Sequence, residues 1–342
     1  VYLQGVRSHT YLSTMKYVSL PDNTDRKLPF YLTMEEYVGS HYLEPGTDLF
    51  FMWQVSPTVI FGRNQIMERE VNLDYCAANN IDIFRRRSGG GCVYADRSNI
   101  MFSYITSSAS SVATTFERYT SMVAEMLRSL GLDATNTGRN DILIGSRKVS
   151  GNAFYHRPGH SIVHGTMLFD TDMAHILNAI TPSKSKLDAK GVASVQSHIT
   201  TLSEHITMSI DEFKQYARNY LCGSEEITLT KADTERIGEM SKPYYSKDWI
   251  EGHTPKAATF SAHRRIEGVG ELDVTINTSR GTLANINIGG DFFLLGDLDS
   301  QLLAPLEGTP YNRQAVEQAI AHLNVGEIIH GLTNQQFVNL LF

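Results

Sequence analysis

The residues best suited to chemistry lie in one segment that runs from Arg85 to Tyr94 and reads Arg-Arg-Arg-Ser-Gly-Gly-Gly-Cys-Val-Tyr. Three consecutive glycines, Gly89 to Gly91, allow a backbone to approach a ligand closely with its N–H groups exposed. Arginines such as Arg86 add bidentate donors for phosphate or carboxylate. The segment has neither the Walker A spacing nor the G-x-G-x-x-G spacing of dinucleotide folds. Its pattern indicates either an anion-binding loop or a flexible loop beside a basic run.

A second group of candidate residues surrounds Lys148. This lysine is followed by Val149, Ser150 and Gly151, and the segment 138–141, Gly-Arg-Asn-Asp, precedes it. A lysine beside a hydroxyl and a glycine at a strand turn can neutralise a phosphate and a carboxylate together. Asp141 offers the carboxylate that a magnesium ion prefers. A surface lysine on a hairpin would show the same pattern.

Three histidines, His156, His160 and His164, repeat at a spacing of four that imitates the metal-binding face of a helix. Because Pro158 and Gly159 lie between them, we expect strands and turns here and no metal site. His164 is better interpreted as a polar group that lines a pocket at the start of a strand.

A basic segment with small residues runs from Lys184 through Lys190 and Gly191 to Val195. A mobile lid that closes over a nucleotide has this composition, and so has a solvated loop. The spacing of the lysines does not separate the two interpretations.

The composition limits what the whole chain can be. Its 342 residues predict about two domains, and 42% hydrophobic with 20% charged residues is typical of globular proteins. The 30 Lys and Arg against 37 Asp and Glu give a net charge of −7, which argues against sequence-independent binding of nucleic acid. Apolar runs stay far below the roughly 20 residues of a membrane span, so none is expected.

The cysteines indicate a reducing compartment. Cys76, Cys92 and Cys222 are odd in number and contain no C-x-x-C pair, so neither a disulfide framework nor a cysteine zinc site is expected. Residues 1–14 show no secretory leader pattern and are left out of the fold assignment, with Met15 resembling a translation start. Together these features predict a cytoplasmic location.

The elements that must position these residues follow from periodicity. Helices are predicted over 29–43, 71–80, 111–130, 173–179, 211–221 and 231–240, and then over 298–303, 312–323 and 333–341. Strands are predicted over 48–55, 58–61, 81–86, 100–106, 271–277 and 282–288, with antiparallel strands joined by tight turns over 141–169. Thr333 and Gln336 have the spacing of a capping box. Periodicity stops near 241–255, so we predict a catalytic domain over 15–245, a linker over 246–256 and an accessory domain over 257–342.

Taken together, these segments resemble the lipoate–protein ligase A family. The motifs that carry the resemblance occur in the family's order and are Pro57 to Gln65, Arg86 to Gly91, Gly138 to Asp141, Lys148 to Gly151, His164 to Thr166 and Lys190 to Val192. The resemblance implies an α+β fold: a catalytic domain of the biotin/lipoate-ligase type with mixed, mainly antiparallel sheets and flanking helices, and a small C-terminal α/β accessory domain. We expect the protein to be a monomer.

The activity that the resemblance implies has two steps. Free lipoate and ATP form lipoyl-AMP and pyrophosphate, with Mg²⁺ as cofactor. The lipoyl group then passes to an acceptor lysine of lipoyl domains of 2-oxoacid dehydrogenase complexes or of glycine-cleavage H protein. Lys148 would be the catalytic residue, because a point cation between the lipoate carboxylate and the α-phosphate stabilises charge in both steps.

The resemblance also implies a set of binding residues. Those of the glycine segment are Arg86, Ser88, Gly89 and Gly90 for lipoate and phosphate, and Gly91, Cys92, Val93 and Tyr94 for the nucleotide. Asn99 and Asp141 would line the nucleotide side, with Asp141 as a magnesium ligand, and Ser150, Ala153 and His164 the pocket wall. Lys190 and Gly191 would belong to a loop that closes over the adenylate.

The chain departs from the family pattern at two positions, and one rival activity stays open. Ala95 stands where the family usually has histidine, and Cys92 where it often has alanine. The alternative is an octanoyl- or lipoyltransferase of the same fold, which takes a carrier-bound acyl group without ATP through an acyl-cysteine. Neither Cys92 nor Cys222 is an obvious nucleophile for it. A non-enzymatic lipoate-binding protein is a further alternative, and a biotin ligase fits less well because its G-R-G-R-x-G loop is missing.

Overall fold

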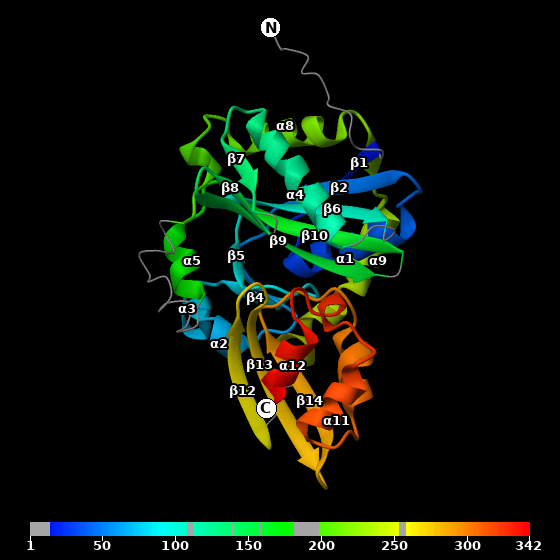
Figure 1. The fold of residues 1–342 in the computed structure, drawn as a ribbon. Helices are drawn as coiled ribbons and strands as arrows, with labels where there is room; N and C mark the ends of the chain where they lie inside the picture. Colours follow the sequence, from blue (N-terminus) through cyan, green and yellow to red (C-terminus); the bar gives the residue numbers. More distant parts are fainter. Residues whose placement is uncertain (1–13, 108–111, 138–139, 158, 181–197, 253–257) are drawn as a thin grey trace.

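The computed structural model describes residues 14–107, 112–137, 140–157, 159–180, 198–252 and 258–342, and it is organised around a large mixed sheet (Figure 1). The strand order is β11 (Glu226–Thr228), β1 (Thr14–Ser19), β2 (Thr47–Trp53), β6 (Asn99–Ser107), β10 (His160–Leu168), β9 (Arg147–Arg157), β8 (Asp141–Ile144) and β7 (Ala134–Asn136). β1 runs parallel to β2 and β11, and the other neighbours pair antiparallel.

Helices cover both faces of this sheet. On one face, α4 (Val112–Arg128) and α8 (Ile210–Cys222) pack on a core that includes Phe50 and Phe102. On the other face, α1 (Leu28–His41) packs on a core that includes Phe51 and Trp53. Successive strand residues point to opposite faces, so the apolar run of β2 supplies both cores. The face under α1 is the one that carries the site described below.

A second, smaller sheet lies beside α1. Its order is β4 (Asp82–Arg85), β3 (Thr58–Phe61), β5 (Val93–Ala95), with β3 parallel to β4 and antiparallel to β5. Three short helices pack against it, namely α2 (Met67–Glu70), α3 (Leu73–Ala78) and α5 (Met173–Ala179). The arginine and glycine segment is the connection from β4 to β5, so its two ends are held by the strands that flank β3 on either side.

The C-terminal part has a core of its own. Its antiparallel sheet contains β12 (Phe260–Ile266), β13 (Gly270–Ser279) and β14 (Thr282–Gly290). α11 (Arg313–Ile320) and α12 (Asn334–Leu341) pack on it, together with the π-helical turn Asp299–Leu303. Thr333 and Gln336 form the expected capping box at the start of α12. Figure 1 shows this domain beneath β4 and the large sheet.

The remaining helical segments are α9 (Lys231–Met240), α10 (Lys247–Glu251) and several 3-10 turns. α9 packs on α1, and α10 follows the 3-10 turn Lys242–Tyr245. Further 3-10 turns are Leu202–Glu204, Ala304–Leu306 and Val325–Glu327. No helix in the described part of the chain combines the length and the apolar character needed to span a bilayer.

The expected fold class is confirmed: mixed sheets with flanking helices precede a small C-terminal domain. The long helices and strands lie where periodicity predicts them. The predictions missed β1, β5, β7, β11 and β12. β5, β7 and β11 have three residues each, too few for an alternating pattern, and β12 carries the consecutive polar residues His263, Arg264 and Arg265.

Candidate active site

A cavity of about 740 Å³ lies between the α1 face of the large sheet, the glycine segment and the C-terminal domain. Its lining residues from the first part of the chain are Leu28, Leu32, Trp53, Ile60, Arg86, Gly90, Gly91, Cys92, Val93, Met101, Asn140, Asp141, Lys148, Gly151, Asn152, Ala153, His164, Gly165 and Thr166. The C-terminal domain contributes Arg265 to Gly270, Asp291 and Phe293. Residues more than 200 positions apart in the sequence therefore share one cavity.

The strand register arranges the lining residues so that one end of the cavity is apolar and the other end is polar. One row of paired residues crosses the sheet from β2 to β8 and consists of Trp53, Met101, Thr166, Gly151 and Asp141. Leu28, Leu32 and Ile60 join Trp53 and Met101 in one buried apolar cluster. The cavity can therefore hold an apolar chain at one end and charged groups at the other.

Lys148 and Asp141 form the charged end. The Nζ atom of Lys148 lies 2.7 Å from Oδ1 of Asp141, and both side chains are about one-third exposed. Gly151, opposite Asp141 in the ladder, makes room for the lysine, since a Cβ there would lie 2.6 Å from Nζ. The main chain of Lys148 is also held in place: its N–H donates to the carbonyl of His198 (2.7 Å), and its carbonyl accepts from the Thr200 N–H (2.9 Å).

Asn152 lies beside this pair and closes over Gly165. Its Nδ2 donates to the carbonyl of Asn140 (2.9 Å), and a Cβ on Gly165 would lie 1.8 Å from its Oδ1. Ser150 and Asn152 are within hydrogen-bond distance of each other (3.2 Å). Gly165 is thus needed where Asn152 crosses the neighbouring strand.

Arg86 shapes the glycine segment from inside. Its guanidinium donates to Oγ of Ser88 (2.9 Å) and to the carbonyl oxygens of Ile60 (3.1 Å), Gly89 (2.6 Å) and Gly91 (2.8 Å). Burial lowers the pKa of Arg86 to about 10, which leaves it protonated at neutral pH. Most of its donors are therefore bound to the protein, whereas the sequence pattern suggested donors for a ligand.

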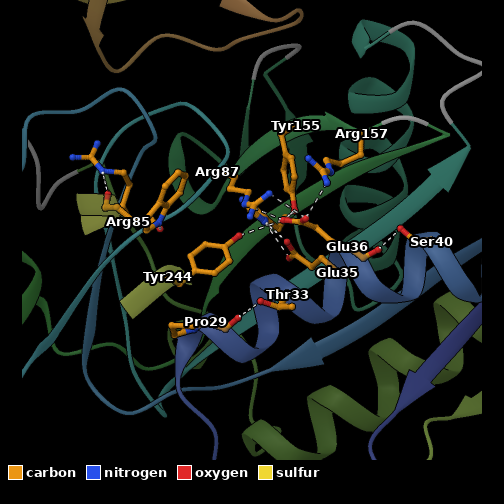
Figure 2. A network of polar contacts seen from close by, with 12 residues as sticks. Pro29, Thr33, Glu35, Glu36, Ser40, Arg85, Arg87, Tyr155, Arg157 and Tyr244 are labelled. Atoms are coloured by element: carbon orange, nitrogen blue, oxygen red, sulfur yellow. Dashed lines mark hydrogen bonds and ion pairs between the residues drawn. The ribbon is translucent and has the colours of Figure 1, made fainter. Parts of the chain in front are cut away.

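The two flanking arginines point elsewhere. Arg85 donates to carbonyl oxygens of the turn that holds Arg63 and Gln65, and to those of Trp249, Ile250 and Glu251 in α10. Figure 2 shows Arg87 on the other side, in a cluster around Glu36. The other members of that cluster are Arg157, Tyr155 and Tyr244. The three consecutive arginines thus tie the segment to the connecting helix, to its own backbone and to α1.

A buried chain of hydrogen bonds runs from the glycine segment to Trp53. Ser88 Oγ lies 2.7 Å from Nε2 of His164, whose Nδ1 lies 2.9 Å from Oε2 of Glu35. Oε1 of Glu35 accepts from Oγ of Ser103 (2.6 Å), which accepts from Nε1 of Trp53 (2.8 Å). Arg86 and Trp53 can only donate, so Ser88 accepts from Arg86 at one end of the chain and Ser103 accepts from Trp53 at the other, which leaves the Ser103 hydroxyl to donate to Glu35.

The C-terminal domain contacts the glycine segment directly. The Gly90 N–H donates to the carbonyl of Phe292 (3.0 Å), and the Gly290 N–H donates to that of Asn64 (2.7 Å). A Cβ on Gly89 would lie 2.4 Å from the Phe292 oxygen, whereas a Cβ on Gly91 would meet nothing within 4 Å. Two of the three glycines therefore make room for the neighbouring domain.

Gly89→Ala is expected to destabilise this contact, because its Cβ would overlap a backbone oxygen that cannot rotate away. We expect a loss of about 1–3 kcal/mol in the free energy of unfolding, as for other overpacked sites. Gly91→Ala is the matched control and should unfold like the parent protein. Urea unfolding of the two variants measures the difference, and equal stability would contradict the contact.

The other candidate residues differ in their distance from the cavity. Arg86, Gly90, Gly91, Cys92, Val93, Asp141, Lys148, Ala153 and His164 line it, whereas Ser88, Gly89, Tyr94, Asn99 and Ser150 do not. Asn99 accepts instead from Thr171 and from the Phe169 N–H, and Tyr94 stacks on His175. Lys190 and Gly191 lie outside the described residues.

His156 and His164 of the histidine series have different partners. Among the described residues, no group of three His, Cys, Asp or Glu side chains could hold a metal ion. His156 interacts with Ser161, and His164 is engaged by Ser88 and Glu35.

Sequence reasoning missed the apolar end of the cavity and the contribution of the C-terminal domain. Leu28, Leu32, Trp53 and Met101 have the signature of ordinary core residues, so no local signal separates them from the rest of the core. The segment Arg265 to Gly270 has no motif. Asn152 could have been singled out, because it lies in the Lys148 motif.

Comparisons with known proteins define the class. The family model of the lipoyl protein ligase A/B catalytic domain matches residues 28–222, more than half of the chain, and that of the bacterial lipoate protein ligase C-terminus matches residues 256–341. The chain belongs to the lipoate–protein ligase family, whose members are enzymes.

Individual relatives extend over nearly the whole chain. It is 32% identical to the lipoate-protein ligase LplJ of Bacillus subtilis, over 91% of this chain and 96% of that protein. It is also 32% identical to lipoate–protein ligase 1 of Staphylococcus aureus, over 96% and 100% respectively. A solved structure of a bipartite lipoate protein ligase with its E2 lipoyl domain, from Thermoplasma acidophilum, is 25% identical with a TM-score of 0.63, covering 72% of this chain and 99% of that one.

Proposed function

We propose that this protein is an ATP-dependent lipoate–protein ligase that forms lipoyl-AMP and then transfers the lipoyl group to an acceptor lysine. The observation that carries the proposal is the graded cavity, which runs from the apolar residues around Trp53 to Lys148. An apolar chain that ends in a carboxylate matches such a gradient. The family relationship supports lipoate as the acid.

Lys148 is the proposed catalytic residue. A lipoate carboxylate and an ATP α-phosphate repel each other, and an ammonium group between them lowers that repulsion. The carboxylate oxygen attacks the α-phosphorus and pyrophosphate leaves. In the second step the neutral acceptor amine attacks the lipoyl carbonyl, loses a proton and displaces AMP, whose phosphate the same lysine stabilises. Asp141 holds the ammonium in place (2.7 Å).

Magnesium enters this proposal as part of the substrate MgATP. Asp141, Glu267 and Asp291 line the cavity, but Asp141 is paired with Lys148 and Asp291 accepts from the Glu271 N–H (2.6 Å). These carboxylates do not fit a magnesium site held by the protein alone, and magnesium commonly takes phosphate oxygens as its main ligands. The expectation of Asp141 as a ligand stays a proposal.

The remaining roles are proposals of the same kind. Gly91, Cys92 and Val93 would contact the nucleotide, Ala153 and His164 the acyl chain, and the segment of Lys190 would exclude water from the adenylate. Arg86, Ser88 and Gly89 would act by holding the glycine segment in shape. The limits 15–245 and 257–342 are proposed for the two domains, and lipoyl domains and glycine-cleavage H protein are proposed as acceptors of a monomeric, cytoplasmic enzyme.

Pyrophosphate exchange tests the proposal without knowledge of the acceptor. Purified protein should exchange labelled pyrophosphate into ATP only when lipoate is present. Exchange without lipoate, or lipoate binding without any exchange, would contradict adenylation and favour the transferase or the binding protein.

Cys92→Ala separates the ligase from the transferase. Cys92 lines the cavity, so it is the one described cysteine placed to carry an acyl group. Cys222 is buried, and burial raises the pKa of its thiol to about 12, which keeps it protonated and a poor nucleophile. We expect Cys92→Ala to retain the exchange rate within a few fold. Loss of all activity, together with an acyl-thioester found by mass spectrometry in the parent protein, would establish the transferase instead.

A further inference from the structure

The C-terminal domain places one positive charge in the wall of the cavity. Arg265, near the end of β12, begins the run from Arg265 to Gly270 that lines the cavity opposite the catalytic domain. We propose that Arg265 binds the β- and γ-phosphates of the nucleotide, an inference that rests on the ligase function proposed above. The accessory domain then contributes a substrate-binding residue.

A count of the cavity's cations supports this role. Among the described residues, the basic side chains that line it are Arg86, Lys148 and Arg265. Arg86 donates four hydrogen bonds to Ser88 and to backbone carbonyl oxygens, so most of its donors are already bound. Lys148 is the candidate for the α-phosphate. MgATP keeps a net negative charge, so a protein cation in addition to Lys148 favours its binding. Among the described lining residues, Arg265 is the basic side chain that has neither of the two roles above.

The position of Arg265 is held by a buried carboxylate. Arg265 and Glu271 are paired across β12 and β13, and Nη1 donates to Oε1 of Glu271 at 3.3 Å. The glutamate side chain is 4% exposed, whereas that of Arg265 is 49% exposed. One corner of the guanidinium is therefore anchored while its other donors face accessible space. A planar fork of this kind matches phosphate oxygens in pairs.

The neighbouring arginine provides a matched control. Arg264 precedes Arg265 on β12, is exposed, and donates to the carbonyl of His263. Successive strand residues point to opposite faces, and Arg264 is not a lining residue of the cavity. Removal of Arg264 changes the charge of the domain by the same amount without changing the cavity wall.

The experiment compares Arg265→Ala, Arg265→Lys and Arg264→Ala in the full-length protein. Lipoate-dependent pyrophosphate exchange gives the KM for MgATP and for lipoate, and calorimetric titration with MgATP gives a Kd that needs no chemistry. For Arg265→Ala we expect both MgATP constants to rise about tenfold or more, since a charged hydrogen-bonded pair is lost, with the KM for lipoate unchanged. Arg265→Lys keeps a partner for Glu271 and should lie between, and Arg264→Ala should match the parent protein.

Each outcome separates the two proposals. Unchanged MgATP constants in Arg265→Ala overturn the inference, and so does an equal rise for MgATP and lipoate, which would indicate general damage to the cavity. If the parent protein binds MgATP but shows no lipoate-dependent exchange, the ligase proposal fails. In that case a raised Kd for MgATP in Arg265→Ala would still support the inference, and an unchanged Kd would overturn it.

Discussion

Lys148→Ala is expected to lower the rate of lipoate-dependent pyrophosphate exchange by about 10²- to 10³-fold, the range for loss of one group that stabilises developing charge. The reason is local: Lys148 is the cation that faces the polar end of the cavity beside Asp141. Without it, the lipoate carboxylate and the α-phosphate meet unscreened. Initial rates at saturating MgATP and lipoate measure the effect on kcat.

Arg147→Ala is the control for this prediction. Arg147 adjoins Lys148 on β9 and pairs at the surface with Glu204 (2.8 Å). Its loss removes the same charge from the same strand but should cost about 1 kcal/mol of stability or less and leave the exchange rate unchanged. If Lys148→Ala and Arg147→Ala behaved alike, Lys148 would not be the catalytic residue.

Glu35→Gln has the second large expected effect, because it replaces an acceptor oxygen with an N–H donor inside the buried chain of hydrogen bonds that joins Ser88 to Trp53. Glu35 is fully buried, accepts from the Ser103 hydroxyl and lies 2.9 Å from Nδ1 of His164. A glutamine amide can accept at its oxygen but must donate at its nitrogen, so one of these partners would face a second donor. We expect a loss of about 1–3 kcal/mol in the free energy of unfolding, the usual cost of an unsatisfied buried polar group.

Two measurements check the expected effect of Glu35→Gln. Urea unfolding followed by tryptophan fluorescence reports on the catalytic domain, because both tryptophans, Trp53 and Trp249, lie in or beside it. Nitrogen NMR of His164 shows which ring nitrogen carries a proton in the parent protein and whether Glu35→Gln changes it. Glu44→Gln is the control, since its carboxylate is 64% exposed and pairs with Lys16. If Glu35→Gln unfolded at the same urea concentration as the parent protein, the buried chain of hydrogen bonds would not stabilise the domain as described.

Most of the regular structure could be predicted because its signals are local. α4 and α8 show a clear helical period, and the capping box of Thr333 and Gln336 depends on residues three apart. β12 escaped prediction because its pairing with β13 decides it, and its own residues are polar. The fold class followed from the order of the long elements and from the family resemblance.

The candidate site could be predicted only in part, and the reason lies in side-chain direction. Lys148, Asp141 and the glycine segment were found because their residue types and spacing are distinctive. The sequence could not show that Arg85, Arg86 and Arg87 turn to three different partners. Consecutive residues project in different directions, and the available acceptors come from distant parts of the chain.

The sequence by itself determined the residue types of the site, the order of the motifs and hence the family to which the chain belongs. Only the tertiary structure decided which of those residues face one cavity, because strand register sets the row from Trp53 to Asp141 and register depends on pairing between distant strands. It also decided that Gly89 and Gly90 meet Phe292 and that Arg265 joins the cavity wall. Packing between domains leaves no periodic signal in either partner, so these contacts appear only when the chain is folded.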